Sequence, residues 1–305
     1  MKQNIIILIV LFTTLFFGAC DTQFLHDEFK EGDWFYLENA EAVMPVWVQG
    51  NKASDVFVIW LHGGGSGGSG MMMSLASAFN ELQEKYAFVY YDQRSMGQAQ
   101  GNVKPESLTV EQYVEDLRKI IYLINFKYNS PTIFLMGGSW GGFLGSAFLA
   151  EPENHQYISG WINACGPYDW ETNNVLRQEW EGGNPYSYDP SKDLDISLWT
   201  MFTSPITFPF FYQLNNLNWQ NNFYWGENFD AVNLTDELYK ITVPSMVLWG
   251  RHDGVTPVPQ AYSYYDGLGS KNKYLHIFEY SAHNIPTDEP ELFVERVTEF
   301  IEKYR

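Results

Sequence analysis

The chain has 305 residues, of which 45% are hydrophobic and 18% charged, enough for one large domain or two smaller ones with a real core. This composition excludes disordered and fibrous classes. Asp and Glu outnumber Lys and Arg by 37 to 18, so the formal net charge is −19. A field of that sign disfavours nucleic acid and anionic lipid as partners.

The first residues have the organisation of an export signal. Lys2 is followed by the apolar run Ile5–Phe17, which is shorter than the ~20 residues that span a bilayer. The small residues Gly18 and Ala19 come next, directly before Cys20. We therefore predict that residues 1–19 are a signal peptide, which is removed from the mature chain.

Small residues before a cysteine resemble the lipobox of bacterial lipoproteins. The resemblance implies lipidation of Cys20 and a place in the bacterial cell envelope, periplasmic or outer-membrane-associated, with the lipid anchor as the only membrane contact. Phe17 stands where that box usually has Leu. Plain secretion and a buried N-terminal helix therefore stay open as alternatives.

Short apolar runs, each followed by a Gly-rich or polar loop, recur along the rest of the chain. Such runs are typical of strands buried on both faces. They lie at Val56–Leu61, Ala87–Tyr91, Thr132–Met136, Gly160–Ala164, Val243–Trp249 and Tyr274–Phe278. Ahead of them, the alternation Met44–Val48 predicts an antiparallel hairpin at the edge of the sheet.

Helical patterns separate several of these runs. Apolar residues recur at helical spacing from Val110 to Ile124, and Thr109 and Gln112 have the spacing of a capping box. A second helix is predicted from Pro290 to the end of the chain. Alternating strands and helices predict an α/β fold in which helices flank a mostly parallel central sheet.

The stretch 167–240 breaks this alternation and is dense in aromatic residues and asparagine. A disordered loop would leave those rings exposed at a high cost, so we interpret the stretch as an inserted helical cap or lid. The cap divides the α/β core into a first part, 20–166, and a second part, 241–305.

The strongest local motif is Gly137-Gly138-Ser139-Trp140-Gly141, between a predicted strand and a helical segment. A G-x-S-x-G pattern in that context is typical of a nucleophile elbow, whose glycines let the chain turn sharply and expose the serine. We therefore predict that Ser139 is a catalytic nucleophile.

A serine nucleophile needs a histidine base and a carboxylate that orients it. Asp253 follows the predicted strand Val243–Trp249 and His283 follows the last strand, which gives the chain order of the α/β hydrolases. Asp169 is an alternative acid. His252 is a less suitable candidate for the base, because it adjoins Asp253 and is poorly placed to bridge that carboxylate to the serine.

The Gly-rich loop His62-Gly63-Gly64-Gly65 follows the strand Val56–Leu61. Backbone N–H groups in such a loop and after the nucleophile can stabilise an oxyanion, and we predict the N–H groups of Gly64 and Trp140 as its donors. His62 is expected to tie the loop down. A phosphate-binding loop is disfavoured, because no Gly-Lys-Ser/Thr follows and the chain is acidic.

Neither a metal nor an organic cofactor is expected, because Cys165 has no neighbouring pair of ligand residues. Cleavage before Cys20 would leave Cys165 as the sole internal cysteine, so no intrachain disulfide could form.

The Gly-rich loop, the segment Asp92-Gln93-Arg94 and the elbow around Ser139 occur together and in this order. This combination resembles the prolyl aminopeptidases, or proline iminopeptidases, of the α/β-hydrolase superfamily. The resemblance implies a cofactor-free serine hydrolase whose helical cap uses carboxylates to bind the free amino terminus of a short peptide. Glu179 and Glu181 lie in a segment that resembles the acid-bearing part of that cap.

Two positions depart from the family pattern. Gly65 stands where the oxyanion loop usually has Pro, and Ser95 stands where Gly usually follows Asp-Gln-Arg. We expect an exported hydrolase of amide or ester bonds, foremost an aminopeptidase. A carboxylesterase with an aromatic cap pocket stays open, as does a catalytically inactive ligand-binding lipoprotein on a hydrolase scaffold.

Overall fold

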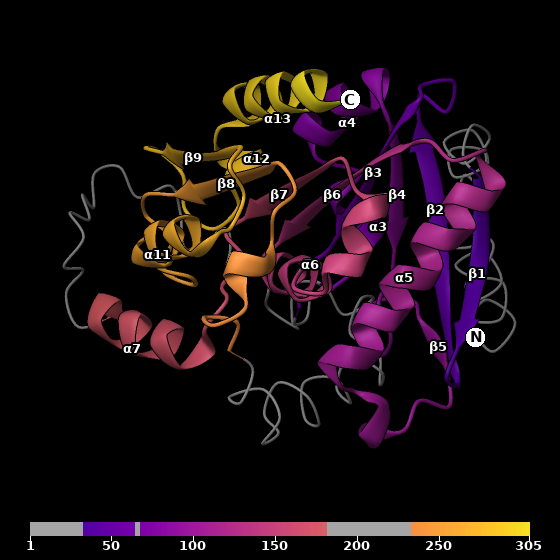
Figure 1. The fold of residues 1–305 in the computed structure, drawn as a ribbon, viewed down its shortest axis with the longest axis horizontal. Helices are drawn as coiled ribbons and strands as arrows, with labels where there is room; N and C mark the ends of the chain where they lie inside the picture. The colour runs from indigo at the N-terminus through magenta and orange to yellow at the C-terminus, as the bar shows by residue number, and fades with distance from the viewer. Residues whose placement is uncertain (1–32, 65–67, 182–232) are drawn as a thin grey trace, which may run out of the picture. The chain divides into compact units, whose positions relative to one another are not determined.

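The computed structural model describes residues 33–64, 68–181 and 233–305, and residues Trp34–Arg305 form one compact unit. Its strands join in one sheet, in the order β1-β2-β4-β3-β6-β7-β8-β9, with β5 paired to β2 (Figure 1). The strands are β1 Asp33–Asn39, β2 Ala42–Gly50, β3 Val56–Leu61, β4 Ala87–Tyr91, β5 Gln100–Gly101, β6 Thr132–Gly138, β7 Gly160–Ala164, β8 Ser245–Gly250 and β9 Lys273–Phe278.

The sheet is parallel from β4 through β9, whereas β2 runs antiparallel to β4. Every residue of β3, β4, β7 and β8 is buried, as their apolar sequences predict. The expected hairpin forms at one edge from β1 and β2, joined by Ala40 and Glu41, which both have positive φ. The predicted α/β class with a mostly parallel sheet is therefore confirmed.

Helices cover both faces of the sheet. The α-helices are α3 Gly70–Met73, α4 Ser77–Lys85, α5 Val110–Lys127, α6 Trp140–Leu149, α7 Trp170–Glu181, α11 Pro259–Gly267, α12 Ile285–Asp288 and α13 Pro290–Tyr304. Short 3-10 turns occur at Pro105–Ser107, Pro152–Tyr157 and Leu238–Lys240. In Figure 1, α4 and α13 lie together on one side of the sheet, and α5, α6 and α11 lie on the other.

Aromatic contacts hold these layers together. Phe79 of α4 stacks on Phe293 of α13, with ring centroids 6.0 Å apart. On the opposite face, the Trp161 indole donates to the Tyr264 hydroxyl at 2.9 Å. A Cβ at Gly145 of α6 would lie 2.2 Å from the Trp161 ring, so glycine there lets α6 approach the sheet closely.

Helix α5 corrects one prediction. The Thr109 side chain accepts a hydrogen bond from the Gln112 N–H at 3.3 Å, as an N-cap does. The Gln112 side chain, however, donates to Asp116 at 3.4 Å. Only the N-cap half of the predicted capping box forms, because the Gln112 side chain bonds to Asp116, one turn further along α5, instead of reaching back to the Thr109 N–H.

The predicted cap, 167–240, is described only at its two ends, and residues 182–232 lie outside the described residues. The two ends meet, because Asp169 and Asn233 form an isolated antiparallel bridge and the Leu234 N–H donates to the Tyr168 carbonyl at 2.8 Å. An insert that leaves and re-enters a core at one place has this arrangement. The cap itself stays a prediction.

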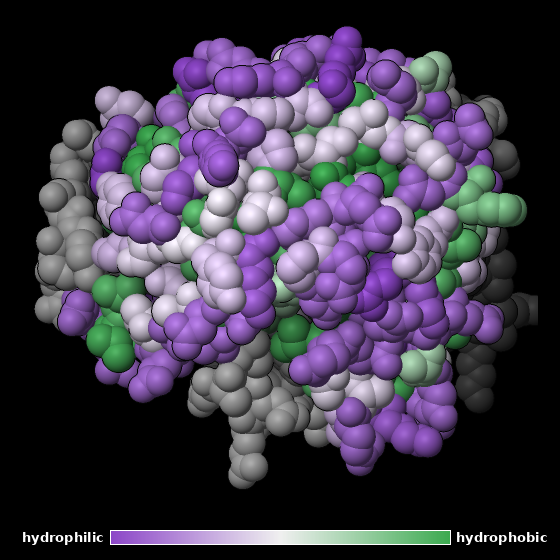
Figure 2. All heavy atoms as spheres, viewed as in Figure 1, coloured by the Kyte–Doolittle hydropathy of each residue, from purple (hydrophilic) through white to green (hydrophobic). Residues whose placement is uncertain are grey.

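The predicted signal, 1–19, and Cys20 also lie outside the described residues. Within the described ranges, no helix combines the length and the apolar character that crossing a bilayer requires. On the face seen in Figure 2, hydrophilic side chains predominate and hydrophobic ones gather only in small, separate groups.

Candidate active site

Ser139 occupies a sharp turn between β6 and α6. Its φ of 53° and ψ of −124° are unusual for a residue with a Cβ, and such strain is typical of functional turns. The flanking glycines make the turn possible, because a Cβ at Gly137 would lie 2.3 Å from the Gly141 carbonyl oxygen. The half-buried Ser139 therefore has the backbone geometry that a nucleophile elbow requires.

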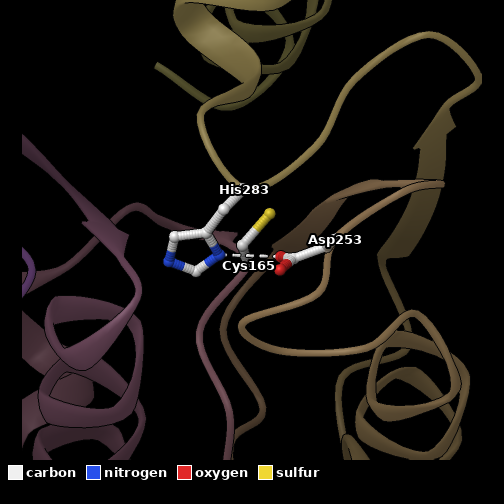
Figure 3. Close-up of side chains that lie close together, drawn as sticks. All are labelled: Cys165, Asp253 and His283. Atoms are coloured by element: carbon white, nitrogen blue, oxygen red, sulfur yellow. Dashed lines mark hydrogen bonds and ion pairs between the residues drawn. The ribbon is translucent and has the colours of Figure 1, made fainter. Parts of the chain in front are cut away.

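The Asp253 and His283 side chains are in direct contact. His283 Nδ1 lies 2.8 Å from Asp253 Oδ2, and a dashed line marks this contact in Figure 3. The carboxylate is buried, and its other oxygen accepts hydrogen bonds from the N–H groups of Val255 and Thr256, both at 2.8 Å. These donors orient the carboxylate, which in turn orients the imidazole through its Nδ1.

Two acidic residues hold the loop that carries His283: Asp288, the last residue of α12, and Glu289, which follows it. Asp288 accepts a hydrogen bond from the Ala282 N–H at 2.9 Å, and Glu289 accepts one from the Ser281 hydroxyl at 2.7 Å. Burial raises the pKa of Asp288 to about 6. Gly250 lets the end of β8 approach this loop, because a Cβ there would lie 1.9 Å from the Ala282 carbonyl oxygen.

The candidate residues follow the carboxyl ends of β6, β8 and β9, which lie along one edge of the sheet because these strands are parallel. Backbone hydrogen bonds link neighbouring ends: the Ser139 N–H donates to Ala164 at 3.0 Å and the Cys165 N–H donates to Leu248 at 2.9 Å. Ligand sites of open α/β sheets lie at this edge.

Cys165, at the end of β7, belongs to the same cluster, which the sequence did not predict. Its Sγ and the ligand atoms of Asp253 and His283 all lie within 4.8 Å of one another (Figure 3). Zinc accepts these residue types, but Asp253 and His283 already bond to each other, and burial raises the pKa of the thiol well above its usual value. The set is therefore a protonated thiol beside an acid–base pair rather than a prepared metal cage.

The Gly-rich loop after β3 lies against the elbow. A Cβ built on Gly63 would lie 3.3 Å from Ser139 Cβ and 3.9 Å from Ser139 Oγ. Gly64, a predicted oxyanion donor, follows directly and is half-buried, whereas Gly65 lies outside the described residues. The predicted donors therefore come from two segments that meet at Ser139.

His62 ties this loop to the neighbouring strand end, as its position predicts. Its Nδ1 lies 2.7 Å from the Gly63 carbonyl oxygen, and its Nε2 accepts the Gln93 N–H at 3.0 Å. Burial lowers the pKa of His62 to about 4, so the imidazole is neutral at pH 7 with its proton on Nδ1. The Gln93 side chain also bonds to both segments, a role that the sequence motif did not reveal.

The alternative acid and base have other partners. Asp169 caps α7, because its carboxylate accepts the Thr172 N–H at 3.1 Å and the Thr172 hydroxyl at 2.6 Å. His252 Nε2 lies 3.1 Å from the Glu279 carbonyl oxygen. Of the two cap acids, Glu179 is exposed on α7, whereas the Glu181 side chain lies outside the described residues.

Comparison with known proteins agrees with this arrangement. Residues 52–181 match a family model described as serine aminopeptidase, S33. The chain is 23% identical over 284 residues to "Probable aminopeptidase YbaC" of Bacillus subtilis (strain 168), in an alignment that covers 81% of this chain and 89% of that protein. It is 26% identical over 283 residues to the proline iminopeptidase of Saccharolobus solfataricus, in an alignment that covers 83% of this chain and 86% of that protein.

Solved structures share the fold. The serine hydrolase CCSP0084 of Cycloclasticus zankles superposes with a TM-score of 0.67 at 19% identity, over 89% of this chain and 98% of that one. The chain therefore has the α/β-hydrolase fold. In sequence it resembles the proline iminopeptidases and the S33 serine aminopeptidases, as the Gly-rich loop, the Asp92-Gln93-Arg94 segment and the elbow motif predict.

Proposed function

We propose that this protein is an exported serine hydrolase in which Ser139 is the nucleophile, His283 the base and Asp253 the residue that orients the base. The observation that carries the proposal is the 2.8 Å contact between Asp253 and His283. Asp253 follows β8 and His283 follows β9, on the same edge of the sheet as the strained Ser139, which follows β6. A serine hydroxyl is a weak nucleophile at neutral pH unless a positioned imidazole accepts its proton.

In this mechanism, Ser139 Oγ attacks the substrate carbonyl carbon while His283 Nε2 takes the hydroxyl proton. The N–H groups of Gly64 and Trp140 stabilise the resulting oxyanion. The protonated imidazole then gives its proton to the departing amine or alcohol, and an acyl group remains on Ser139. Water, activated by the same imidazole, releases that acyl group and restores the enzyme.

The proposed substrates are short peptides with a free amino terminus, foremost those that begin with proline or a small residue. The names of the relatives and of the matched family support this class. Helix α7 supports it too, because Glu179 and Glu181 lie on the helix that begins the predicted cap. A carboxylate there would pair with the ammonium group of the substrate.

Hydrolysis assays test the reaction. The protein is compared with its Ser139→Ala and Asp253→Asn variants on Pro-, Ala- and N-blocked Pro-arylamides and on a p-nitrophenyl ester. We expect cleavage of the free Pro-arylamide over the blocked one, loss of activity in Ser139→Ala and a ~10⁴-fold fall in kcat in Asp253→Asn. Ester cleavage without amide cleavage would refute the aminopeptidase and favour the carboxylesterase.

A fluorophosphonate probe separates an enzyme from a binding protein on the same scaffold. An activated Ser139 is labelled and Ser139→Ala is not, whereas an inactive scaffold is labelled in neither form. The substrate contact is tested separately with Glu179→Gln, which should raise KM for the free Pro-arylamide and leave ester cleavage unchanged.

Export and lipidation rest on the N-terminal sequence pattern alone. Growth with radiolabelled palmitate should label the protein but not its Cys20→Ser variant, and the labelled form should sediment with membranes. Release of an unlabelled mature chain into the periplasm or medium would favour plain secretion instead.

A further inference from the structure

Gln93 lies two residues after the end of β4 and is fully buried, and its side-chain amide connects two segments of the proposed active site. Its Nε2 donates to the His62 carbonyl oxygen at 2.9 Å, and its Oε1 accepts the Trp140 indole N–H at 2.7 Å. Its backbone N–H also donates to His62 Nε2 at 3.0 Å. One side chain is therefore hydrogen-bonded to the loop after β3 on one side and to the start of α6 on the other.

Of the two partners of Gln93, Trp140 itself carries one proposed oxyanion donor, and His62 lies two residues before Gly64, which carries the other. His62 precedes Gly63 and Gly64, and Gly63 already lies against the Ser139 side chain. Trp140 carries the other donor on its own backbone and follows Ser139 directly. The distance between the donors is fixed only if the loop and the helix start are fixed relative to each other.

The surroundings of Gln93 make it a firm link. On one side, Asp92 accepts the Gly70 N–H at 2.7 Å and thereby holds the far end of the Gly-rich loop. On the other, Arg94 forms a buried ion pair with Asp116 of α5. The glutamine backbone therefore has little freedom, and its amide transmits that rigidity to both segments.

We propose that Gln93 is a positioning residue that sets the separation of the two oxyanion donors, the N–H groups of Gly64 and Trp140. The inference rests on the serine-hydrolase mechanism proposed above. An amide suits the position because it offers one donor to a carbonyl oxygen and one acceptor to an indole N–H. Glutamate would present only acceptors when ionised and would leave the His62 carbonyl oxygen without a donor.

The test uses Gln93→Met, which keeps the length of the side chain and removes both of its hydrogen bonds. We expect kcat to fall by ~10–100-fold with KM within about twofold, because misplaced oxyanion donors weaken transition-state binding more than substrate binding. The affinity for a boronic acid that forms a tetrahedral adduct should fall in parallel. Gln83→Met on α4, which loses a single side-chain hydrogen bond to Phe79, serves as the control and should keep its kcat.

A double-variant cycle identifies the link itself. Trp140→Phe removes the indole N–H from the other side of the contact, so combining it with Gln93→Met should cost no more kcat than Gln93→Met alone. Unchanged kcat in Gln93→Met overturns the inference and leaves the serine-hydrolase function standing. A rise in KM with unchanged kcat, or additive losses in the cycle, also overturns it.

The two proposals fail in different ways. If the parent protein neither reacts with a fluorophosphonate nor loses activity on Ser139→Ala, the hydrolase function and this inference fall together. If the parent is active but Gln93→Met loses activity only in proportion to its folded fraction, measured by circular dichroism, Gln93 is merely structural.

Discussion

The buried ion pair between Arg94 and Asp116 gives the sharpest stability prediction. Arg94 Nε lies 2.6 Å from Asp116 Oδ2 and Nη2 lies 2.7 Å from Oδ1, with the two side chains 0% and 2% exposed. Burial raises the pKa of Asp116 although the guanidinium lowers it, so desolvation outweighs the attraction. Removing one partner would leave the other charge buried without compensation, so Asp116→Asn should cost about 3–5 kcal/mol of unfolding free energy.

Urea denaturation followed by circular dichroism measures this loss as a lower midpoint with an unchanged m value. Glu299→Gln is the control, because the Arg296–Glu299 pair is exposed and should be worth less than about 1 kcal/mol. The double variant Arg94→Met/Asp116→Leu should regain most of the loss, since an apolar pair needs no charge compensation. An Asp116→Asn protein as stable as the parent would refute this reasoning.

Three further outcomes follow from the site. Gly63→Ala should lower kcat by ~10²-fold with little change in Tm, because its Cβ would lie 3.3 Å from Ser139 Cβ; full activity would contradict this. The pKa of His62 lies near 4 in the folded protein and near 6.5 when unfolded. The contribution of His62 to the free energy of unfolding is therefore present at neutral pH and falls as the pH drops. Between pH 7 and pH 5 the stability advantage over His62→Gln should shrink by about 2 kcal/mol in urea titrations, and a constant difference would refute it. The Cys165 thiol, whose pKa burial raises, should resist iodoacetamide at pH 8 in the native protein and react once it unfolds; mass spectrometry of its peptide decides.

The sequence predicts the sheet well because the strands next to the site are buried on both faces. An unbroken apolar run such as Val56–Leu61 has one plausible environment, and the polar or Gly-rich residues after it mark the carboxyl end where chemistry collects. The same logic locates Ser139, Asp253 and His283, because each follows a predicted strand. Bounds shift by one or two residues: β8 begins at Ser245 rather than Val243.

The sequence does not reveal which strand ends are neighbours, and Cys165 shows the consequence. Its position after the strand Gly160–Ala164 is visible, but its proximity to Asp253 and His283 depends on β7 pairing with β8 in the sheet. The capping box fails for a different reason. Local spacing assigns Gln112 to the helix start, whereas its side chain instead donates to Asp116, four residues further along the same helix.

The segment after β4 places three charged or amide side chains in succession inside the core, and each joins the end of β4 to a different element. Asp92 accepts the Gly70 N–H at the end of the Gly-rich loop, and burial raises the pKa of Asp92 to about 6. Gln93 joins the two segments that carry the proposed oxyanion donors, and Arg94 forms an ion pair with Asp116 of α5. The chain then turns at Ser95, whose φ of 57° lies in the left-handed region. The prolyl aminopeptidases, which this chain resembles, usually have glycine there, and the backbone geometry explains why: a Cβ in that conformation costs about 1–2 kcal/mol. Ser95 therefore departs from the family in residue type while its backbone stays in the conformation that glycine favours, so the departure bears on local stability rather than on the path of the loop.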